Sequence, residues 1–509
     1  MYDSANMYND SEKSVQPKEN CMEFINGTKV KDIQIAYIGG GSRGWAWTFM
    51  TDLAMEDAIS GTIRLYDIDH EASRRNEVIG NHLMNREETA GDWKFETKYS
   101  LKEALTGADF VVISILPGTF DEMESDVHLP ERLGIYQSVG DTAGPGGMIR
   151  GLRAVPMFKE IAEAVRDYAP EAWVINYTNP MSLLVKTLYS VYPEIKAFGC
   201  CHEVFNTMKV LKGIFEETTG ETVEDWHDII VNVIGINHFT WFTEASCHGR
   251  DLFPIYAKYI DEHFEEGYTA GIAASDKGWM DDVFACGHRV KMDLFRRYGA
   301  IAAAGDRHLA EFMPGNEYLN DPETVRSWMF SLTPVSWRKN DLKNRLARSE
   351  RLLKGEEEIP LVSTGEEGVL LIKALLGLCR VVSNVNLPNT ALQIGNLPKD
   401  AVVETNAVFS RDSVRPVYAG NLTEELKALI TPHVDNHERI LKAALGITEG
   451  MKPEECRELV KEAFRNDPAV IAHHPSEEEI SSLVDDMIEA TMAYLPEEWK
   501  KQQNTLDLE

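Results

Sequence analysis

The stretch IQIAYIGGGSRG, residues 33–44, decides the fold of this chain. It opens with apolar residues that favour β-structure, a composition typical of a buried strand. The strand runs directly into Gly39, Gly41 and Gly44, which complete a G-x-G-x-x-G pattern. A helical pattern follows over residues 45–58. Strand, glycine-rich turn and helix therefore come in the order of a dinucleotide-binding unit.

The next predicted strand, residues 62–66, supports this interpretation. It ends before Asp67 and Asp69, where a carboxylate could accept hydrogen bonds from ribose hydroxyls. The helix N-terminus of such a unit faces the pyrophosphate. We predict that the dinucleotide is bound by Gly39, Gly41, Ser42, Arg43, Gly44, Asp67 and Asp69. The alternative is a glycine-rich turn in another kind of α/β domain.

Strands and helices alternate over the following residues. Apolar strands are predicted at 108–116, 172–177 and 195–199, and helices at 149–167 and 181–192. Residues 121–147 are polar and are expected to be rich in turns. The alternation predicts an α/β fold with an N-terminal Rossmann-type, doubly wound parallel sheet.

The second part of the chain has a different pattern. It is mostly helical, with amphipathic stretches near residues 281–297 and 368–382 and short strands at 231–236 and 390–408. We predict a loose N-terminal tail at residues 1–30, a dinucleotide-binding Rossmann domain at 31–200 and a C-terminal α+β substrate domain at 201–509. The default place for a site is between the two lobes.

Composition narrows the class of protein. The chain carries 51 Lys and Arg against 82 Asp and Glu, a net charge of −31, which argues against a nucleic-acid partner. There is neither a long apolar run nor a signal-peptide pattern, so we expect a cytoplasmic protein with no membrane partner. The seven cysteines are scattered and odd in number, which fits a reducing compartment.

Polar side chains follow three successive predicted strands: Asn176 and Asn179, then Cys201 and His202, then Asn237 and His238. Ends of parallel strands converge at one edge of a sheet, where doubly wound folds bind ligands. Cys201 and His238 could thus hold one divalent metal through a thiolate and an imidazole. The alternative is a buried core cysteine and a structural histidine, since metal-site patterns normally show tighter spacing.

Several motifs together resemble glycoside hydrolase family 4: IGGGSRG, SDVHLPERLGIYQSVGDTAGPGGMIRGLR, NYTNP, GCCHEVF and GINHFTW. They come in that family's order over residues 33–314, and a looser resemblance continues to about residue 445. The resemblance implies a fold like lactate and malate dehydrogenases, NAD, a divalent metal, usually Mn²⁺, and cytoplasmic hydrolysis of glycosides. Relatives of this kind are commonly dimers or tetramers, so we expect a homodimer or homotetramer.

The family resemblance also implies a mechanism. NAD oxidises carbon 3 of the sugar, a base removes the carbon 2 proton, the glycosidic oxygen leaves, water adds and the hydride returns. The metal, held by Cys201 and His238, polarises the sugar oxygens. The acid is expected to be His202 or Asp126, and the base Tyr298 or Asp306. Substrate contacts are expected from Asn179, Asn237 and Arg307.

The type of sugar is suggested by differences within the family. Members acting on 6-phosphosugars carry an R-x-G-G-like segment where this chain has PGTFDEMESD. Its acidic residues would repel a phosphate. The CHE triplet and GDRHLAEF favour an α-galacturonidase. The alternative within the family is an α-galactosidase or α-glucosidase. Outside the family, the alternatives are an NAD-dependent hydroxy-acid dehydrogenase and a protein that merely binds NAD.

A uronide substrate places one more demand on this acidic chain. The sugar carboxylate needs a local cation, and the planar fork of arginine is the better partner. The candidates are Arg150, Arg153, Arg289 and Arg307 with its neighbour His308. For each of them, an ordinary ion pair or a contact with an NAD phosphate is the alternative.

Overall fold

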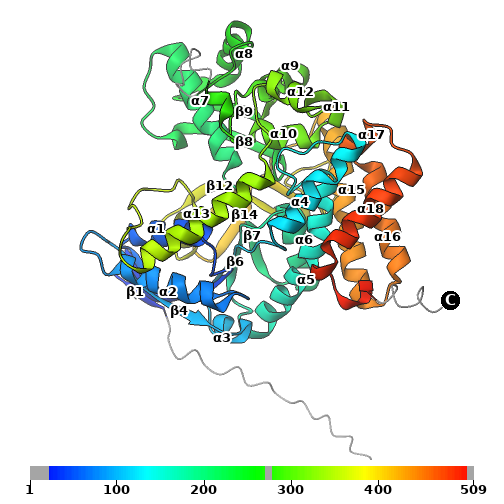
Figure 1. Ribbon diagram of the computed structural model, residues 1–509. Helices are drawn as coiled ribbons and strands as arrows, with labels where there is room; N and C mark the ends of the chain where they lie inside the picture. Colours follow the sequence, from blue (N-terminus) through cyan, green and yellow to red (C-terminus); the bar gives the residue numbers. More distant parts are fainter. Residues whose placement is uncertain (1–21, 270–277, 501–509) are drawn as a thin grey trace, which may run out of the picture.

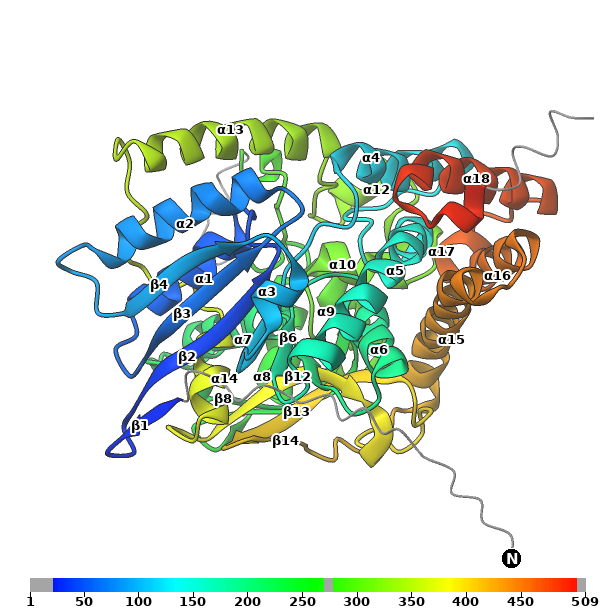
Figure 2. The ribbon, with the colours of Figure 1, turned by 90° about the horizontal axis from the view of Figure 1, so that it is seen from below.

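The computed structural model describes residues 22–269 and 278–500, so most of the predicted N-terminal tail lies outside the described residues. A ten-stranded sheet forms the centre of the molecule, in the order β14-β13-β12-β7-β6-β5-β2-β3-β4, with β1 paired to β2 (Figures 1 and 2). From β7 to β4 in this order, each strand is parallel to the next. The predicted doubly wound parallel sheet is therefore confirmed.

The bounds of these strands are β1 (Glu23–Ile25), β2 (Lys29–Ile38), β3 (Ile59–Tyr66), β4 (Asp92–Lys98), β5 (Phe110–Ile113), β6 (Trp173–Asn176), β7 (Lys196–Gly199), β12 (Val381–Pro388), β13 (Val402–Ser410) and β14 (Ser413–Pro416). The last three are antiparallel and extend the sheet beyond β7. The second part of the chain thus completes the sheet of the first, and the domain division near residue 200 stays a prediction.

Alternate residues of the central strands face two different cores. In β2, Ile35 and Tyr37 join one core, whereas Ala36 and Ile38 join the other. The first core is covered by α1 (Trp45–Ala54), α2 (His70–Met84) and α14 (Gly368–Leu375). The second is covered by α3 (Leu101–Leu105), α5 (Gly144–Tyr168), α6 (Met181–Val191), α15 (Glu424–Gly446), α16 (Pro453–Asn466) and α18 (Glu477–Thr491). A strand buried on both faces explains the continuous apolar runs in the sequence.

A smaller sheet packs against β13, with two helices beside it (Figure 1). It contains β8 (Ile229–Ile236), β9 (Phe239–Cys247), β10 (Arg250–Asp251) and β11 (Ile301–Ala302). Its helices are α7 (Glu203–Thr219), α8 (Leu252–His263), α9 (Arg289–Tyr298) and α10 (Asp306–Phe312). The Asn406 amide donates to the Val231 carbonyl at 2.7 Å, which ties the two sheets together.

The other helices are α4 (Phe120–His128), α11 (Gly315–Tyr318), α12 (Pro322–Ser327), α13 (Val335–Leu353) and α17 (Pro468–Ile471). Short 3₁₀ turns are η1 (Pro130–Leu133), η2 (Trp226–Asp228), η3 (Trp279–Asp281), η4 (Asn389–Ala391), η5 (Ile447–Glu449), η6 (Met492–Tyr494) and η7 (Glu497–Lys500). Among the described helices, none is both long and apolar enough to cross a membrane.

The segment expected to be turn-rich begins with a helix instead. Thr119 caps the backbone of α4, and the Glu122 carboxylate accepts the Thr119 N–H at 2.7 Å, forming a capping box. Such reciprocal capping favours a helix even where most side chains are polar. Glu122, one of the acidic residues expected to repel a phosphate, thus stabilises the start of this helix.

Candidate active site

His238 lies in the tight turn between β8 and β9. It has a left-handed backbone, with φ of 61°, and its side chain is buried. Its Nδ1 lies 3.0 Å from the Thr142 Oγ1, and that hydroxyl donates to the Asp141 carboxylate at 2.7 Å. The turn thus presents an oriented imidazole next to the loop that begins α5.

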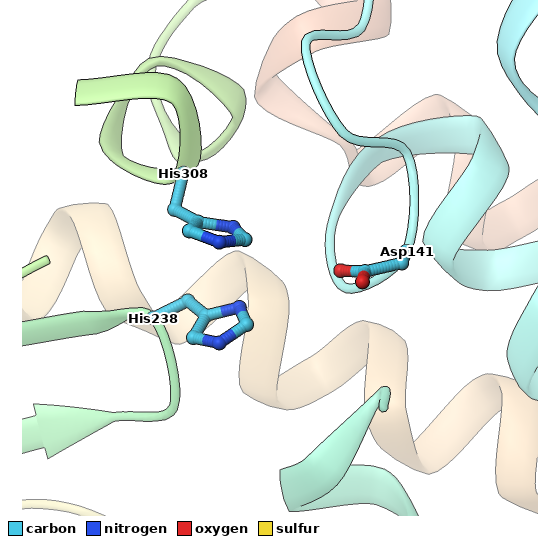
Figure 3. Close-up of side chains that lie close together, drawn as sticks. All are labelled: Asp141, His238 and His308. Atoms are coloured by element: carbon cyan, nitrogen blue, oxygen red, sulfur yellow. The ribbon is translucent and has the colours of Figure 1, made fainter. Parts of the chain in front are cut away.

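Two further side chains meet His238 (Figure 3). His308 comes from α10, and its ring lies over that of His238 with centroids 3.9 Å apart. Asp141 points toward both rings from the loop before α5. The ligand atoms of Asp141, His238 and His308 all lie within 4.8 Å of one another. Two imidazoles and a carboxylate at this separation can hold one divalent metal ion.

The electrostatics favour the metal-binding forms of these groups. Burial, with help from neighbouring His308, lowers the pKa of His238 to about 3. Burial also lowers the pKa of His308, whose Nδ1 is buried without a partner. For Asp141, burial acts to raise the pKa, but Arg150 and the two histidines bring it below its ordinary value. Neutral imidazoles and an ionised carboxylate are the forms that coordinate a metal.

Helix α10 holds the Asp141 loop in place. The Glu311 carboxylate accepts the N–H groups of Val139 and Gly140 at 2.6 and 2.8 Å. The Ser138 hydroxyl donates to the Arg307 carbonyl. The motif GDRHLAEF therefore supplies one side chain to the cluster, His308, and anchors the loop that supplies another.

The glycine-rich loop has the geometry of a phosphate cradle. A Cβ on Gly39, whose φ is +99°, would lie 2.0 Å from the Ser114 carbonyl oxygen. A Cβ on Gly41 would lie 2.6 Å from the Ala72 Cβ. Gly44 precedes α1, whose N-terminus has no side-chain cap. Bare backbone at an uncapped helix N-terminus fits a pyrophosphate.

The two acidic residues after β3 are placed differently. Asp67 accepts the N–H groups of Gly41 and Asp69, so it shapes the loop. Asp69 caps α2 and has its second carboxylate oxygen 3.9 Å from Arg43. Asp69 is the more exposed of the two and has the freer oxygen for a ribose hydroxyl. The role of these residues, with Ser42 and Arg43, in cofactor binding stays a prediction.

Comparison with known proteins gives the family. The protein-family model described as "Family 4 glycosyl hydrolase" matches residues 34–217, and the family model of its C-terminal domain matches residues 233–470. An α-galacturonidase of Lachnoclostridium phytofermentans is 62% identical over 478 residues, covering 94% of this chain and 100% of that protein. The chain belongs to the family 4 glycosyl hydrolases. The resemblance seen in the sequence motifs is confirmed.

Solved structures agree with the fold. The crystal structure of lplD from Bacillus subtilis matches with a TM-score of 0.83 and 50% identity, covering 90% of this chain and 100% of that one. A 6-phospho-α-glucosidase from gut microorganisms, solved with NAD and Mn²⁺, matches with a TM-score of 0.72 at 20% identity, covering 91% and 99%. The predicted Rossmann-type class of this family 4 chain is thus confirmed.

Some of the residues predicted at strand ends lie together, although β8, which precedes Asn237 and His238, belongs to the smaller antiparallel sheet and not to the parallel one. Cys201 is buried, and Asn237 lies within hydrogen-bonding reach of its thiol. His202 is close enough to His238 to influence its pKa. Buried amide oxygens of Asn179 and Asn237 have no partner. Among the groups of three metal-ligating side chains in the described chain, His238 appears without Cys201, so the Cys201–His238 pair stays a prediction.

Asp126, one of the candidate acids, is bound in a buried ion pair. Arg153 donates to its two carboxylate oxygens at 3.0 and 2.5 Å, and both side chains are almost fully buried. Burial still raises the pKa of Asp126, against the effect of Arg153. This geometry supports a structural role for the pair, and it occupies Arg153, one of the candidates for binding the substrate carboxylate.

We predict that Arg153→Met lowers the free energy of unfolding by about 3–5 kcal/mol, because the Asp126 carboxylate would remain buried without its partner. Urea unfolding followed by circular dichroism measures the change. Lys159→Gln, on the same helix, is the matched control. It breaks a more exposed pair with Glu163 and should cost less than about 1 kcal/mol. Equal losses in the two variants would contradict the buried-pair argument.

The candidate bases lie in other surroundings. Tyr298 packs on Trp241, and its hydroxyl accepts from Arg297 at 3.0 Å; burial raises its pKa. Asp306 accepts the N–H groups of Val290 and Lys291 at the start of α9, and burial raises its pKa to about 6. The identity of the base stays a prediction.

A second group of possible metal ligands surrounds Asp306. Ligand atoms of Cys286, His288 and Asp306 lie within 4.8 Å of one another. However, both Asp306 oxygens are engaged by backbone N–H groups, and the charge of buried Lys291 acts on both Asp306 and Cys286. A cation beside this lysine is disfavoured, so we interpret the group as structural.

Sequence reasoning missed Asp141 as a member of the cluster and noted His308 only as a neighbour of Arg307. A signal was present, since Asp141 opens DTAGPGG and His308 lies in GDRHLAEF, two motifs already singled out. Only the fold shows that both converge on the turn containing His238.

Proposed function

We propose that this chain is an NAD- and divalent-metal-dependent α-galacturonidase. The observation that carries the proposal is the 62% identity, over the whole length of the relative, to a protein described as an α-galacturonidase. The buried cluster and the dinucleotide-type loop support it. In this family NAD would supply transient oxidation of sugar carbon 3, and a divalent metal would polarise substrate oxygens.

The residues around the cluster have distinct expected tasks. His238 would hold the metal, together with Asp141 and His308 of the cluster or with Cys201 as predicted from the sequence. The unpartnered amide oxygens of Asn179 and Asn237 would accept hydrogen bonds from sugar hydroxyls. In this arrangement the substrate is oriented by groups that are already buried and in place.

His202 is the favoured acid. Its Nδ1 lies 3.1 Å from Glu366, and its Nε2 lies 3.6 Å from Glu203. Burial acts to lower its pKa, but these two carboxylates raise it above its ordinary value. An imidazolium that persists near neutral pH can donate a proton to the departing glycosidic oxygen.

The proposal predicts a substrate preference. Para-nitrophenyl α-galacturonide should be cleaved with a higher kcat/KM than the α-galactoside, the α-glucoside or their 6-phosphates, measured side by side with NAD and Mn²⁺. A preference for the neutral galactoside or glucoside would favour that branch of the family instead. Stoichiometric accumulation of NADH would indicate a hydroxy-acid dehydrogenase.

We also propose a cytoplasmic homodimer or homotetramer without a nucleic-acid or membrane partner. The net charge of −31 supports the absence of nucleic acid, because phosphate binding needs a basic face. Light scattering after size exclusion would give the oligomeric state, and a monomer would contradict it.

A further inference from the structure

Helix α13 runs from α4, near the cluster, to α2, beside the glycine-rich loop (Figure 2). Its start is fixed to the Asp141 loop, since the Thr333 N–H donates to the Ser138 carbonyl at 3.1 Å. The Arg307 guanidinium donates to the Thr333 hydroxyl at 2.5 Å. Toward its other end, Arg345 donates to the Arg43 carbonyl at 3.2 Å. The helix therefore spans the dinucleotide loop and the cluster.

Arg338 lies in the first turns of α13. Within the described chain its guanidinium has no hydrogen-bond or ion-pair partner, and its Nε is buried. It is close enough to Asp141, Arg307 and Glu311 for their charges to act on it. An arginine that is partly buried and unpaired is costly, which indicates a missing anionic partner.

The other candidate arginines are already engaged. Arg153 is paired with Asp126, and Arg289 with Glu265. Arg307 donates to Thr333 and the Val283 carbonyl, and Arg150 donates through Nε to the Asn179 carbonyl. Arg150 uses only its Nε, whereas in the described part of the chain the whole guanidinium of Arg338 has no partner. No motif in the sequence singles Arg338 out.

The charges around the cluster leave room for one more anion. Arg150, Arg307 and Arg338 all act on the region of Asp141 and Glu311. Burial raises the pKa of Glu311 to about 7, so part of its negative charge is lost near neutral pH. Asp126 and Asp341 also act on Arg150 and Arg338, but each is already paired, with Arg153 and with Arg345. The guanidinium of Arg338 is therefore left without an anion of its own.

We propose that Arg338 binds the carbon 6 carboxylate of the uronide and so determines the preference for uronides over neutral sugars. This inference rests on the proposed function. A guanidinium binds both oxygens of a carboxylate, whereas it gains little from a neutral hydroxymethyl group. Arg150 and Arg307 add charge at the same place but keep their protein partners.

The test compares Arg338→Gln and Arg338→Lys with Lys339→Gln, a neighbour whose amine pairs with Asp121 and Glu124. We expect Arg338→Gln to lower kcat/KM on para-nitrophenyl α-galacturonide about a hundredfold or more, and that on the α-galactoside less than about threefold. Arg338→Lys should recover part of the loss, because it restores charge without the fork. Lys339→Gln should resemble wild type.

Binding measurements distinguish a contact with the substrate carboxylate from a contact with the cofactor. By titration calorimetry, Arg338→Gln should lose affinity for galacturonate but keep its affinity for galactose and for NAD. A loss of NAD affinity, or equal losses on both glycosides, would overturn the inference in favour of a cofactor or structural role. If wild type prefers the galacturonide and Arg338→Gln keeps that preference, the inference about Arg338 is overturned and the proposed function stands. A wild type that prefers the galactoside would overturn the proposed function as well.

Discussion

His238→Ala is expected to abolish divalent-metal binding and to lower activity by about a thousandfold or more. His238 belongs both to the observed cluster with Asp141 and His308 and to the pair with Cys201 predicted from the sequence. A bound metal contributes several kcal/mol to catalysis of this kind, and each 1.36 kcal/mol is about a tenfold change in rate. Metal content by plasma mass spectrometry and kcat/KM with added Mn²⁺ are the measurements.

The same experiment can decide which side chains accompany His238. Cys201→Ser should also lose the metal, because a hydroxyl is a poor substitute for a thiolate. Cys200→Ser is its matched control, since Cys200 is the adjacent buried cysteine and lies in a different apolar cluster. Asp141→Asn and His308→Ala test the observed cluster in the same way.

The outcomes are distinct. Loss of the bound metal in Cys201→Ser, with the metal retained in Cys200→Ser, would support the Cys201 thiolate as a ligand. If Asp141→Asn and His308→Ala lose the metal while Cys201→Ser retains it, the ligands are instead the observed trio of Asp141, His238 and His308. Full activity of His238→Ala, or of wild type after chelation and dialysis, would exclude a metal mechanism.

The fold was largely predictable because its signals are local. Residues 33–45 carry the apolar run, the glycines and the first residue of the helix within one short stretch, and the structure confirms that order. Strands buried on both faces also produce apolar runs that need no knowledge of their neighbours. Each of these features can be detected without knowing how the chain folds back on itself.

The sheet extension was harder to predict. The structure ends α14 at Leu375 and starts β12 at Val381, within a stretch interpreted from sequence as one amphipathic helix to residue 382. What fixes β12 as a strand is its pairing with β13 and β7, contacts that join distant parts of the chain. Strand propensity depends on such neighbours more than helix propensity does.

The site shows the same limit. Strand-end arguments placed His202 correctly after β7, a parallel strand of the main sheet, but Asn237 and His238 lie in the β8–β9 turn of the smaller antiparallel sheet. Packing between the two sheets, and not a shared parallel edge, brings them together. Strand-end arguments could not find Asp141, which lies in a loop, or Arg338, which lies on a helix of ordinary charged appearance. Both positions are set by long-range hydrogen bonds to α10 and to the Ser138 loop.

NAD is expected to be required for activity but in catalytic amounts. The predicted cradle can be disabled through Gly41, where a Cβ would lie 2.6 Å from the Ala72 Cβ and 2.9 Å from the Asp67 carboxylate. Gly41→Ala should therefore raise the Kd for NAD by at least about tenfold, because a displaced loop costs more than about 1.4 kcal/mol of binding. Gly107→Ala is a control away from the cradle: its added Cβ meets nothing within 4 Å, and the backbone strain at its φ of +72° should lower stability but leave the Kd for NAD unchanged.

Isotope exchange tests the reaction itself. If hydrolysis passes through removal of the carbon 2 proton, a galacturonide deuterated at carbon 2 should release galacturonate that has exchanged its deuterium for solvent hydrogen. The proton becomes acidic only while carbon 3 is oxidised, so the exchange should also depend on NAD. NADH absorbance should stay flat during many turnovers, because the hydride returns to each sugar. Direct displacement at carbon 1, as in glycosidases with two carboxylates, would instead retain the deuterium completely and proceed without NAD.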